Sequence, residues 1–419
     1  MAGGAVAAWK ALGDSDSGPS IPAPPRRRAL WTYAMDGGGG WLTGLSLSGD
    51  SLYVTDDGPV AVHAVSARSG RRRWVTEVTG GTPGEATLGR VTVTGSTVCV
   101  AVRGGHVHAL ADADGARRWT TGPLGGDEPA APVVIGPTLC VLLRTRTEGD
   151  EAGGTRTVVE GVLCGLDVRS GRVKWRTGGH RLLLADRPRG QLIAQTADGD
   201  GLSALDADSG ERRWSLPKQD TLALGSDLLY ATGTRTADEV SAYELSTGRL
   251  RWKAPAPPKG YAQALGAYLT VSADGRTLHA CDGGTGAVYA YDAMTGDRRW
   301  RVTVDSPVVP AAAAAGSAVF LASTSGFPAF HAPDGYLTAR AASDGRQLWR
   351  TDSGVCTSVA VAARGTVLVA HDAQTWAYDA RTGAARWRVS GGPGVGDAPL
   401  TAGGRLYVVT DAGIGAVTL

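Results

Sequence analysis

Two histidines, His106 and His108, lie one residue apart in a stretch whose alternating residues are typical of a β-strand. Residues i and i+2 of a strand share a face, so this pair is a candidate for metal binding. His108 and His63, however, fill the place in a repeated unit that Cys164 and Tyr289 fill elsewhere. Because imidazole, thiol and phenol alternate there, we interpret the place as structural and predict no metal site.

Two acidic pairs resemble fragments of a calcium-binding loop. Asp198 and Asp200 form one pair, and Asp206 and Asp208 form the other. Neither has the spacing of a calcium loop or its terminal glutamate. Each pair instead sits beside glycine, which is typical of tight turns, so we predict turns at both places.

Five cysteines, Cys99, Cys140, Cys164, Cys281 and Cys356, are scattered along the chain without a C-x-x-C pair. An odd number of scattered cysteines argues against a disulfide framework. All but Cys356 lie in or beside short apolar runs, which favours buried free thiols. A disulfide between Cys140 and Cys164 remains an alternative, since both are predicted on strands of one sheet.

Sequence motifs of the common enzyme classes are missing. The chain has no G-x-S-x-G, P-loop or dinucleotide-binding fingerprint in a strand–turn–helix context, and no protein-kinase motifs. The formal charge of +2 gives no electrostatic reason to expect nucleic acid or an anionic membrane as a partner.

A Gly-x-x-x-Trp unit recurs eight times, at intervals of 38 to 56 residues between tryptophans. Seven copies have alanine ten residues before the tryptophan, and the eighth has Gly165 there. Alternating residues before an Asp-x-x-Ser/Thr-Gly turn indicate a strand, and apolar runs upstream supply two more. An Arg-rich strand ending in tryptophan completes the unit. Four strands in about 40 residues are typical of a propeller blade.

These alanine, glycine and tryptophan positions resemble the tryptophan-docking motif of the pyrroloquinoline-quinone-type propeller repeats. The resemblance covers residues 31–419 and implies an all-β propeller of four-stranded blades, in which each indole packs on the neighbouring blade. The docking tryptophans are then Trp31, Trp74, Trp119, Trp175, Trp214, Trp252, Trp300, Trp349 and Trp387.

The two chain ends each supply part of a ninth unit. Residues 413–419 begin a repeat that stops before its turn, and Trp31 lies on a strand without a preceding turn. We predict nine blades, the last closed by both ends, with eight blades as the alternative that the family usually shows. The propeller is predicted to occupy residues 28–419 and to be monomeric.

Residues 1–27 are predicted to lie outside the propeller. Residues 2–9 are apolar but too few to cross a bilayer, and residues 13–25 form a Pro/Ser/Asp-rich stretch typical of a disordered linker. This order is the one expected just outside a membrane anchor, so we expect an anchor upstream of Met1, with a plain disordered tail as the alternative. An extracytoplasmic or membrane-associated location follows, and a cytoplasmic one is its alternative.

Quinone-dependent dehydrogenase activity is the enzymatic function that the resemblance implies. Such enzymes carry adjacent cysteines near the quinone and hold calcium through acidic and amide ligands. This chain has no adjacent cysteines and no asparagine. We therefore predict no cofactor and no enzymatic activity, and keep a quinone-binding relative as the alternative function.

Binding through loops is the function that remains. Long insertions at residues 144–161 and 323–335 and the connections between blades are expected on one face. That face is predicted to carry Glu85, Asp127, Glu128, Asp305, Phe327, Phe330 and Asp397. The chain is similar in layout to the propeller regions of actinomycete serine/threonine kinases and of the outer-membrane assembly lipoprotein. We predict a scaffold or sensor that binds a protein or cell-envelope ligand, with the two phenylalanines as anchors.

Overall fold

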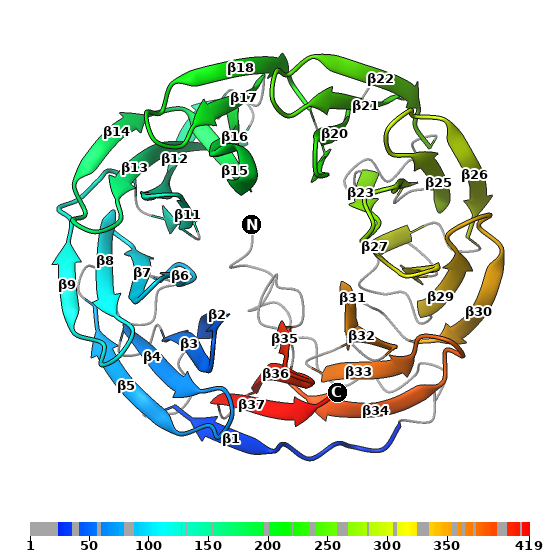
Figure 1. Cartoon of the computed structure of the whole chain (residues 1–419), viewed down its shortest axis with the longest axis horizontal. Helices are drawn as coiled ribbons and strands as arrows, with labels where there is room; N and C mark the ends of the chain where they lie inside the picture. Colours follow the sequence, from blue (N-terminus) through cyan, green and yellow to red (C-terminus); the bar gives the residue numbers. More distant parts are fainter. Residues whose placement is uncertain are drawn as a thin grey trace.

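The computed structural model arranges nine β-sheets in a closed ring around a central channel (Figure 1). It describes residues 24–35, 42–56, 60–78, 88–126, 128–130, 132–151, 154–196, 201–219, 221–233, 239–257, 267–282, 285–304, 308–324, 335–353, 358–362, 365–371, 374–391, 400–410 and 413–419. The predicted all-β propeller of nine blades is confirmed, and the eight-bladed alternative is wrong. Within these residues the only helix is the 3₁₀ turn η1 (Arg187–Arg189).

Each blade is an antiparallel sheet whose strands follow one another in chain order from the channel to the rim, except that the outermost strand of blade 9 is β1 from the N-terminus. Blade 1 holds β2 (Leu42–Ser48), β3 (Ser51–Asp56), β4 (Ala61–Ser66) and β5 (Arg72–Glu77). Blade 2 holds β6 (Thr92–Thr94), β7 (Thr97–Val102), β8 (His106–Ala111) and β9 (Arg117–Thr120). Blade 3 holds β10 (Glu128–Pro129), β11 (Val133–Ile135), β12 (Thr138–Glu151), β13 (Gly154–Asp167) and β14 (Val173–Thr177).

The next three blades repeat this order. Blade 4 holds β15 (His180–Asp186), β16 (Gln191–Thr196), β17 (Gly201–Asp206) and β18 (Arg212–Pro217). Blade 5 holds β19 (Thr221–Leu224), β20 (Leu228–Thr232), β21 (Glu239–Glu244) and β22 (Leu250–Pro255). Blade 6 holds β23 (Ala267–Val271), β24 (Thr277–Asp282), β25 (Ala287–Asp292) and β26 (Arg298–Thr303).

The ring is completed by strands from both ends of the chain. Blade 7 holds β27 (Val308–Ala315), β28 (Ala318–Thr324), β29 (Gly335–Ala341) and β30 (Gln347–Asp352). Blade 8 holds β31 (Ser358–Ala362), β32 (Thr366–His371), β33 (Gln374–Asp379) and β34 (Ala385–Ser390). Blade 9 holds β35 (Leu400–Ala402), β36 (Arg405–Thr410), β37 (Gly413–Thr418) and β1 (Trp31–Ala34).

The repeat's alanine and tryptophan face each other across the two outer strands of a blade. Ala290 pairs with Trp300, and the register shifts directly after this pair. Ala416 of β37 pairs with Trp31 of β1 in the same way, although the two residues come from opposite ends of the chain. Blade 9 therefore preserves the internal register of the repeat without a covalent turn between its outer strands.

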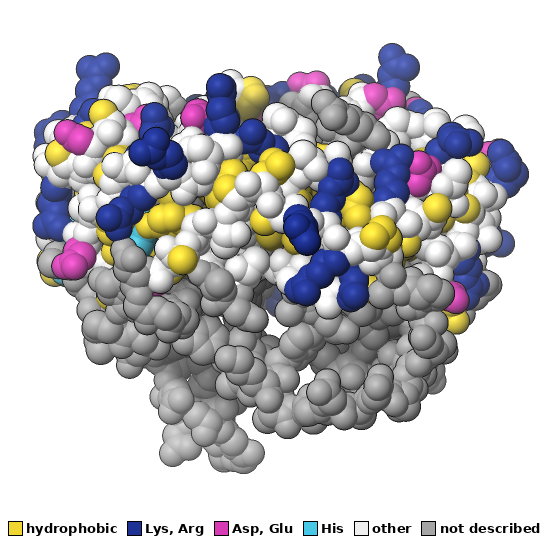
Figure 2. Space-filling view, turned by 90° about the horizontal axis from the view of Figure 1, so that it is seen from below, with side chains coloured by type: hydrophobic (Ala, Val, Ile, Leu, Met, Phe, Trp, Pro, Cys, Tyr) yellow, Lys and Arg dark blue, Asp and Glu magenta, His cyan; other side chains and the backbone are white. Residues whose placement is uncertain are grey.

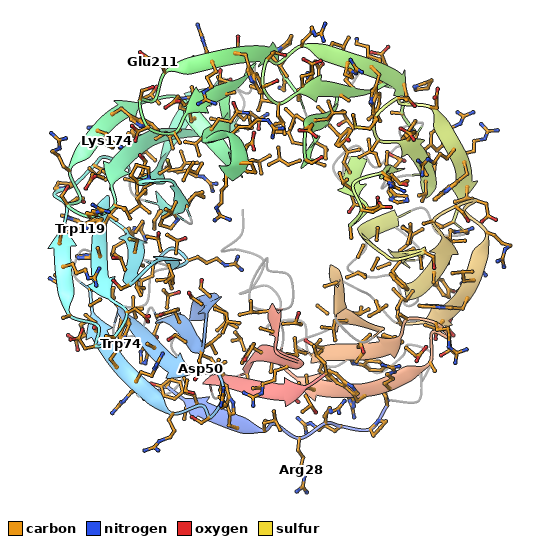
Figure 3. The ribbon with its side chains drawn as sticks, in the orientation of Figure 1. Arg28, Asp50, Trp74, Trp119, Lys174 and Glu211 are labelled. Carbon is orange, nitrogen blue, oxygen red and sulfur yellow. The ribbon has the colours of Figure 1, made fainter. Side chains whose placement is uncertain are left out.

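Each of eight indoles lies against the turn glycine of the next blade. A Cβ on Gly296 would lie 2.6 Å from ring atoms of Trp252, and its φ of +79° also favours glycine. Trp252 Nε1 donates a hydrogen bond of 3.1 Å to the carbonyl of Ala293 in the same turn. Figure 3 labels two of these tryptophans, Trp74 and Trp119, near the rim at successive blades. The contacts run Trp31–Gly70, Trp74–Gly115, Trp119–Gly171, Trp175–Gly210, Trp214–Gly248, Trp252–Gly296, Trp300–Gly345 and Trp349–Gly383.

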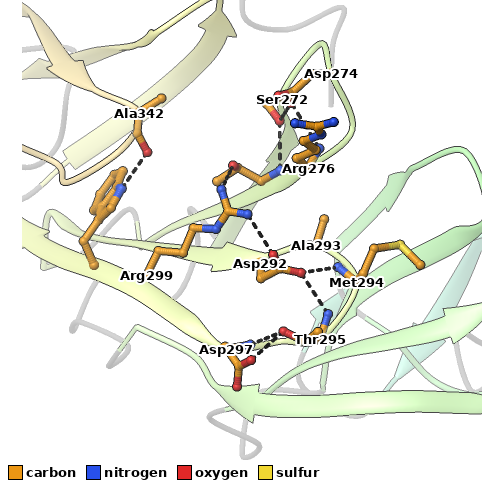
Figure 4. Close-up of polar contacts among 12 residues, drawn as sticks. Ser272, Asp274, Arg276, Asp292, Ala293, Met294, Thr295, Asp297, Arg299 and Ala342 are labelled. Atoms are coloured by element: carbon orange, nitrogen blue, oxygen red, sulfur yellow. Dashed lines mark hydrogen bonds and ion pairs between the residues drawn. The ribbon is translucent and has the colours of Figure 1, made fainter.

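The turn itself is fixed by its aspartate. Asp292 Oδ1 accepts the backbone N–H groups of Met294 and Thr295, and its Oδ2 accepts a 2.7 Å bond from Arg299 (Figure 4). The hydrogen bond from Arg299 lowers the pKa of Asp292. Arg299 also donates to Thr277 on β24, so one guanidinium joins three strands of the blade.

Burial follows the blade interfaces. The buried apolar side chains among the described residues form nine clusters, and each cluster joins two neighbouring blades. No helix in the described part of the chain has the length and hydropathy to span a membrane. The core is therefore a ring of similar contacts, which leaves the channel, the rim and the two faces for recognition.

Candidate functional site

Most of the predicted binding face lies outside the described residues. Glu128 alone belongs to a strand, β10, where it pairs with Arg144 of β12. The other predicted members are Glu85, Asp127, Asp305, Phe327, Phe330 and Asp397, and they fall outside the described ranges. The two phenylalanine anchors consequently remain a prediction.

The first insertion is a β-hairpin, where the sequence indicated a loop. β12 and β13 pair from Thr138 and Asp167 at one end to Glu151 and Gly154 at the other. Each strand has 14 residues, whereas the corresponding β24 and β25 have six. The missed signal was the alternation of threonine and valine with charged residues, which favours paired strands despite the glycines. The hairpin thus extends well past the ends of the other second and third strands.

The base of this hairpin is packed between blades 3 and 4. A Cβ on Gly161 would collide with the carbonyl of His180 on β15, so glycine is needed for this close approach. On the other side, Gly126 has a φ of +82° and lies against the backbone of Leu143. Burial lowers the pKa of His180, so its ring is favoured in the neutral form at this interface. The hairpin is therefore attached to a well-packed base.

The strands that line the channel are almost free of charge. The innermost strands β2, β6, β11, β19, β23, β27, β31 and β35 contain no acidic residue, basic residue or histidine. β15 and β10 are the exceptions. β15 contains His180, Arg181 and Asp186, and β10 contains Glu128. Asp186 accepts bonds from Gln191 and Arg189 of its own blade.

The rim has the opposite character. The nine outermost strands together carry 16 lysines and arginines and two acidic residues, Glu77 and Asp352. Figure 2 shows lysine and arginine side chains spread over the described outer wall. Several of them are engaged within their blade, as Arg213 is with Asp206 at 2.6 Å. The strands therefore change from mostly uncharged at the channel to basic at the rim.

The histidines singled out in the sequence bond within their own blade. His106 Nδ1 lies 3.0 Å from the carbonyl oxygen of Thr121, and His108 Nδ1 lies 2.9 Å from Oγ1 of Thr120. Among the described residues, no group of three or more His, Cys, Asp or Glu side chains is placed to hold a metal ion. Asp198 and Asp200 lie outside the described ranges, while Asp206 caps its own turn as expected.

The four described thiols are free and buried, as the apolar runs around them indicated. Burial raises the pKa values of Cys99, Cys140 and Cys281 to about 12 and that of Cys164 to about 11. The Cys140–Cys164 disulfide is wrong, because the two residues belong to clusters on opposite sides of blade 3. Cys356 lies outside the described residues.

A buried polar contact that the sequence analysis did not predict joins blades 9 and 1. The Tyr33 hydroxyl lies 2.9 Å from His63 Nδ1, and His63 Nε2 lies 3.8 Å from a carboxylate oxygen of Asp56. All three residues are buried. His63 therefore has a structural role in the interface that closes the ring, in agreement with the interpretation of its place in the repeat.

The fold and its repeat define a nine-bladed propeller of the PQQ-like class. The chain belongs to the family whose model is described as outer membrane protein assembly factor BamB, with matches to residues 22–178, 150–255, 236–335 and 333–418. A curated relative, the serine/threonine-protein kinase AfsK of Streptomyces coelicolor, is 34% identical over 179 residues, which are 42% of this chain and 18% of the kinase. The chain thus matches less than a fifth of that relative's length.

Solved structures share the fold at low identity. BamB from Moraxella catarrhalis aligns with 18% identity and a TM-score of 0.51, covering 84% of this chain and 95% of that one. Quinohemoprotein alcohol dehydrogenase from Comamonas testosteroni aligns with 14% identity and a TM-score of 0.55, covering 93% and 73%. An assembly factor and an alcohol dehydrogenase both appear among these structures, so the fold alone does not decide the function.

Proposed function

We propose that this protein is a non-enzymatic propeller scaffold or sensor that binds a protein or cell-envelope ligand through the face bearing the β12–β13 hairpin. The observation that carries the proposal is the hairpin itself, a long two-stranded arm on a packed base. Its edges beyond Thr145 and Val162 are not paired with any described strand, and free strand edges are suited to binding another polypeptide. The opposite face has short turns whose aspartates bond their own backbone.

Eight of the innermost strands carry no charged residue, which favours this function over the dehydrogenase alternative. These eight strands offer neither cations for the acidic groups of a quinone nor acidic ligands for its metal. The described thiols are separate and buried, so they do not form an adjacent pair near the channel. Calorimetry with pyrroloquinoline quinone and calcium should therefore give no heat of binding, and saturable binding would favour the alternative.

The relatives support a location outside the cytoplasm. The family model is described as an outer membrane protein assembly factor. We propose an extracytoplasmic or membrane-associated protein. The reading frame upstream of Met1 and fractionation of cells that express the native gene would test this location.

Photo-crosslinking at the hairpin tests the binding face. A photoreactive residue at Asp150 or Thr155 is expected to give a discrete adduct with one envelope partner in intact cells. Met294, which is half exposed in a turn of the opposite face, is the matched control position. Replacing residues 146–159 by an Asn-Gly turn between Thr145 and Glu160 should abolish the partner's co-purification without unfolding the ring. Equal adducts from both faces would contradict the proposal.

A further inference from the structure

The ninth docking tryptophan, Trp387, has no turn glycine to lie against. The next blade is blade 9, whose third strand, β37, and outer strand, β1, come from opposite ends of the chain. Arg27 stands four residues before Trp31, which is the place that glycine fills in the eight complete units. Its guanidinium lies 5.0 Å from the centroid of the Trp387 ring, within the range of a cation–π contact.

Backbone bonds hold the same segment to blade 8. Arg27 N–H donates to the carbonyl of Arg388 at 2.7 Å, and Arg388 N–H donates to the carbonyl of Pro25 at 3.1 Å. Arg26 forms a parallel bridge with Arg388, and its side chain donates to Ser390. Residues 25–27, placed in the linker by the sequence, thus extend the outer edge of β34 before the chain enters β1.

The outer strand of blade 9 also lacks the hydrogen bond from its indole to the next blade's turn, which most blades have. Trp31 Nε1 is buried and has no hydrogen-bond partner, whereas seven other docking indoles each donate to a turn carbonyl. The equivalent acceptor, the carbonyl of Ala67, instead accepts bonds from Arg405 and Tyr407. β1 is therefore held without a covalent turn on one side and without an indole hydrogen bond on the other.

We propose that residues 24–34 form a releasable latch and that Arg27 secures it against Trp387. The latch detaches from β34 and β37 as a unit while blades 2 to 7 stay folded. Because residues 1–23 join the latch at Pro24, a force or a ligand acting on them would act first on the interfaces of β1 with β37 and of residues 25–27 with β34. This inference rests on the ring closure and does not depend on the proposed binding face.

Hydrogen exchange of the full chain, followed by mass spectrometry, tests the latch. Arg27→Ala is expected to speed exchange in β1 and β34 about two- to tenfold, the range that loss of a cation–π contact gives, with no change in blades 4 to 6. Arg27→Lys keeps the cation and should restore most of the protection.

Arg28→Ala is the matched control, because Arg28 is exposed and points away from the ring (Figure 3). It should exchange like the unmodified protein. Equal protection in the Arg27→Ala and Arg28→Ala variants would overturn the role of Arg27. Faster exchange spread evenly over all blades in Arg27→Ala would overturn the latch, since it would show global instead of local opening.

Discussion

Adding one methyl group to a docking glycine should measure the contact between blades. Gly296 and Gly275 both have positive φ, at +79° and +70°. A Cβ on Gly296 would lie 2.6 Å from Trp252, whereas a Cβ on Gly275 would meet nothing within 4 Å. Both alanine variants carry the left-handed backbone penalty of about 1–2 kcal/mol. Only Gly296→Ala adds an overpacking cost of about 1–3 kcal/mol.

The difference between the two variants is therefore the quantity to measure. Urea unfolding followed by tryptophan fluorescence should place Gly296→Ala about 1–3 kcal/mol below Gly275→Ala, with similar slopes. Combining Gly296→Ala with Trp252→Phe should relieve part of the clash, so the two costs should not add. Equal costs for the two glycine variants, or strict additivity in the double variant, would refute docking as the reason for the repeat's glycine.

Three further perturbations have defined outcomes. Burial lowers the pKa of His279 to about 4, so the folded state binds fewer protons than the unfolded state, and stability falls as pH drops from about 6.5 towards 4. His279→Phe should reduce the loss of unfolding free energy between about pH 6.5 and pH 4 by up to about 3 kcal/mol. If urea titrations show the same acid sensitivity in this variant, the role of His279 is contradicted. Trp300→Ala should cost about 3–5 kcal/mol in the same assay, against less than about 0.5 for the exposed neighbour Arg301→Ala. The four buried thiols should resist a thiol reagent at pH 8 until guanidinium unfolds the chain, as mass mapping would show; modification in the native state would contradict their burial.

The repeat made most of the fold predictable. Short-range patterns fix each blade, because the turn aspartate, the glycine and the tryptophan lie within about 11 residues of one another in the sequence. Closure also followed from the sequence, since Trp31 supplies what the last repeat lacks. The burial of His279 was not predicted from the sequence. Tyr230 and Phe320 fill the equivalent places in blades 5 and 7 and are ordinary core residues. A buried imidazole without a hydrogen bond at this place departs from that pattern.

The features that escaped prediction depend on distant parts of the chain. The contact of Arg27 with Trp387 joins residues 360 positions apart, and a charge run beside a proline-rich stretch is usually solvated. The hairpin of blade 3 was hidden by its glycines and charges, which are common in loops. The candidate binding face depends on side chains outside the described residues, so its composition is still known only from the sequence.

The nine interfacial clusters have a consequence for how such a ring changes during evolution. Each blade packs its indole against one neighbour and its turn against the other, so the contacts at a single interface do not depend on the number of blades in the ring. Duplication of one repeat would insert a unit that already fits both neighbours, and the ring would accommodate it by a small change in the tilt between blades. The blade count is then the outcome of gene duplication and closure geometry, while the split ninth blade marks where the chain ends must meet.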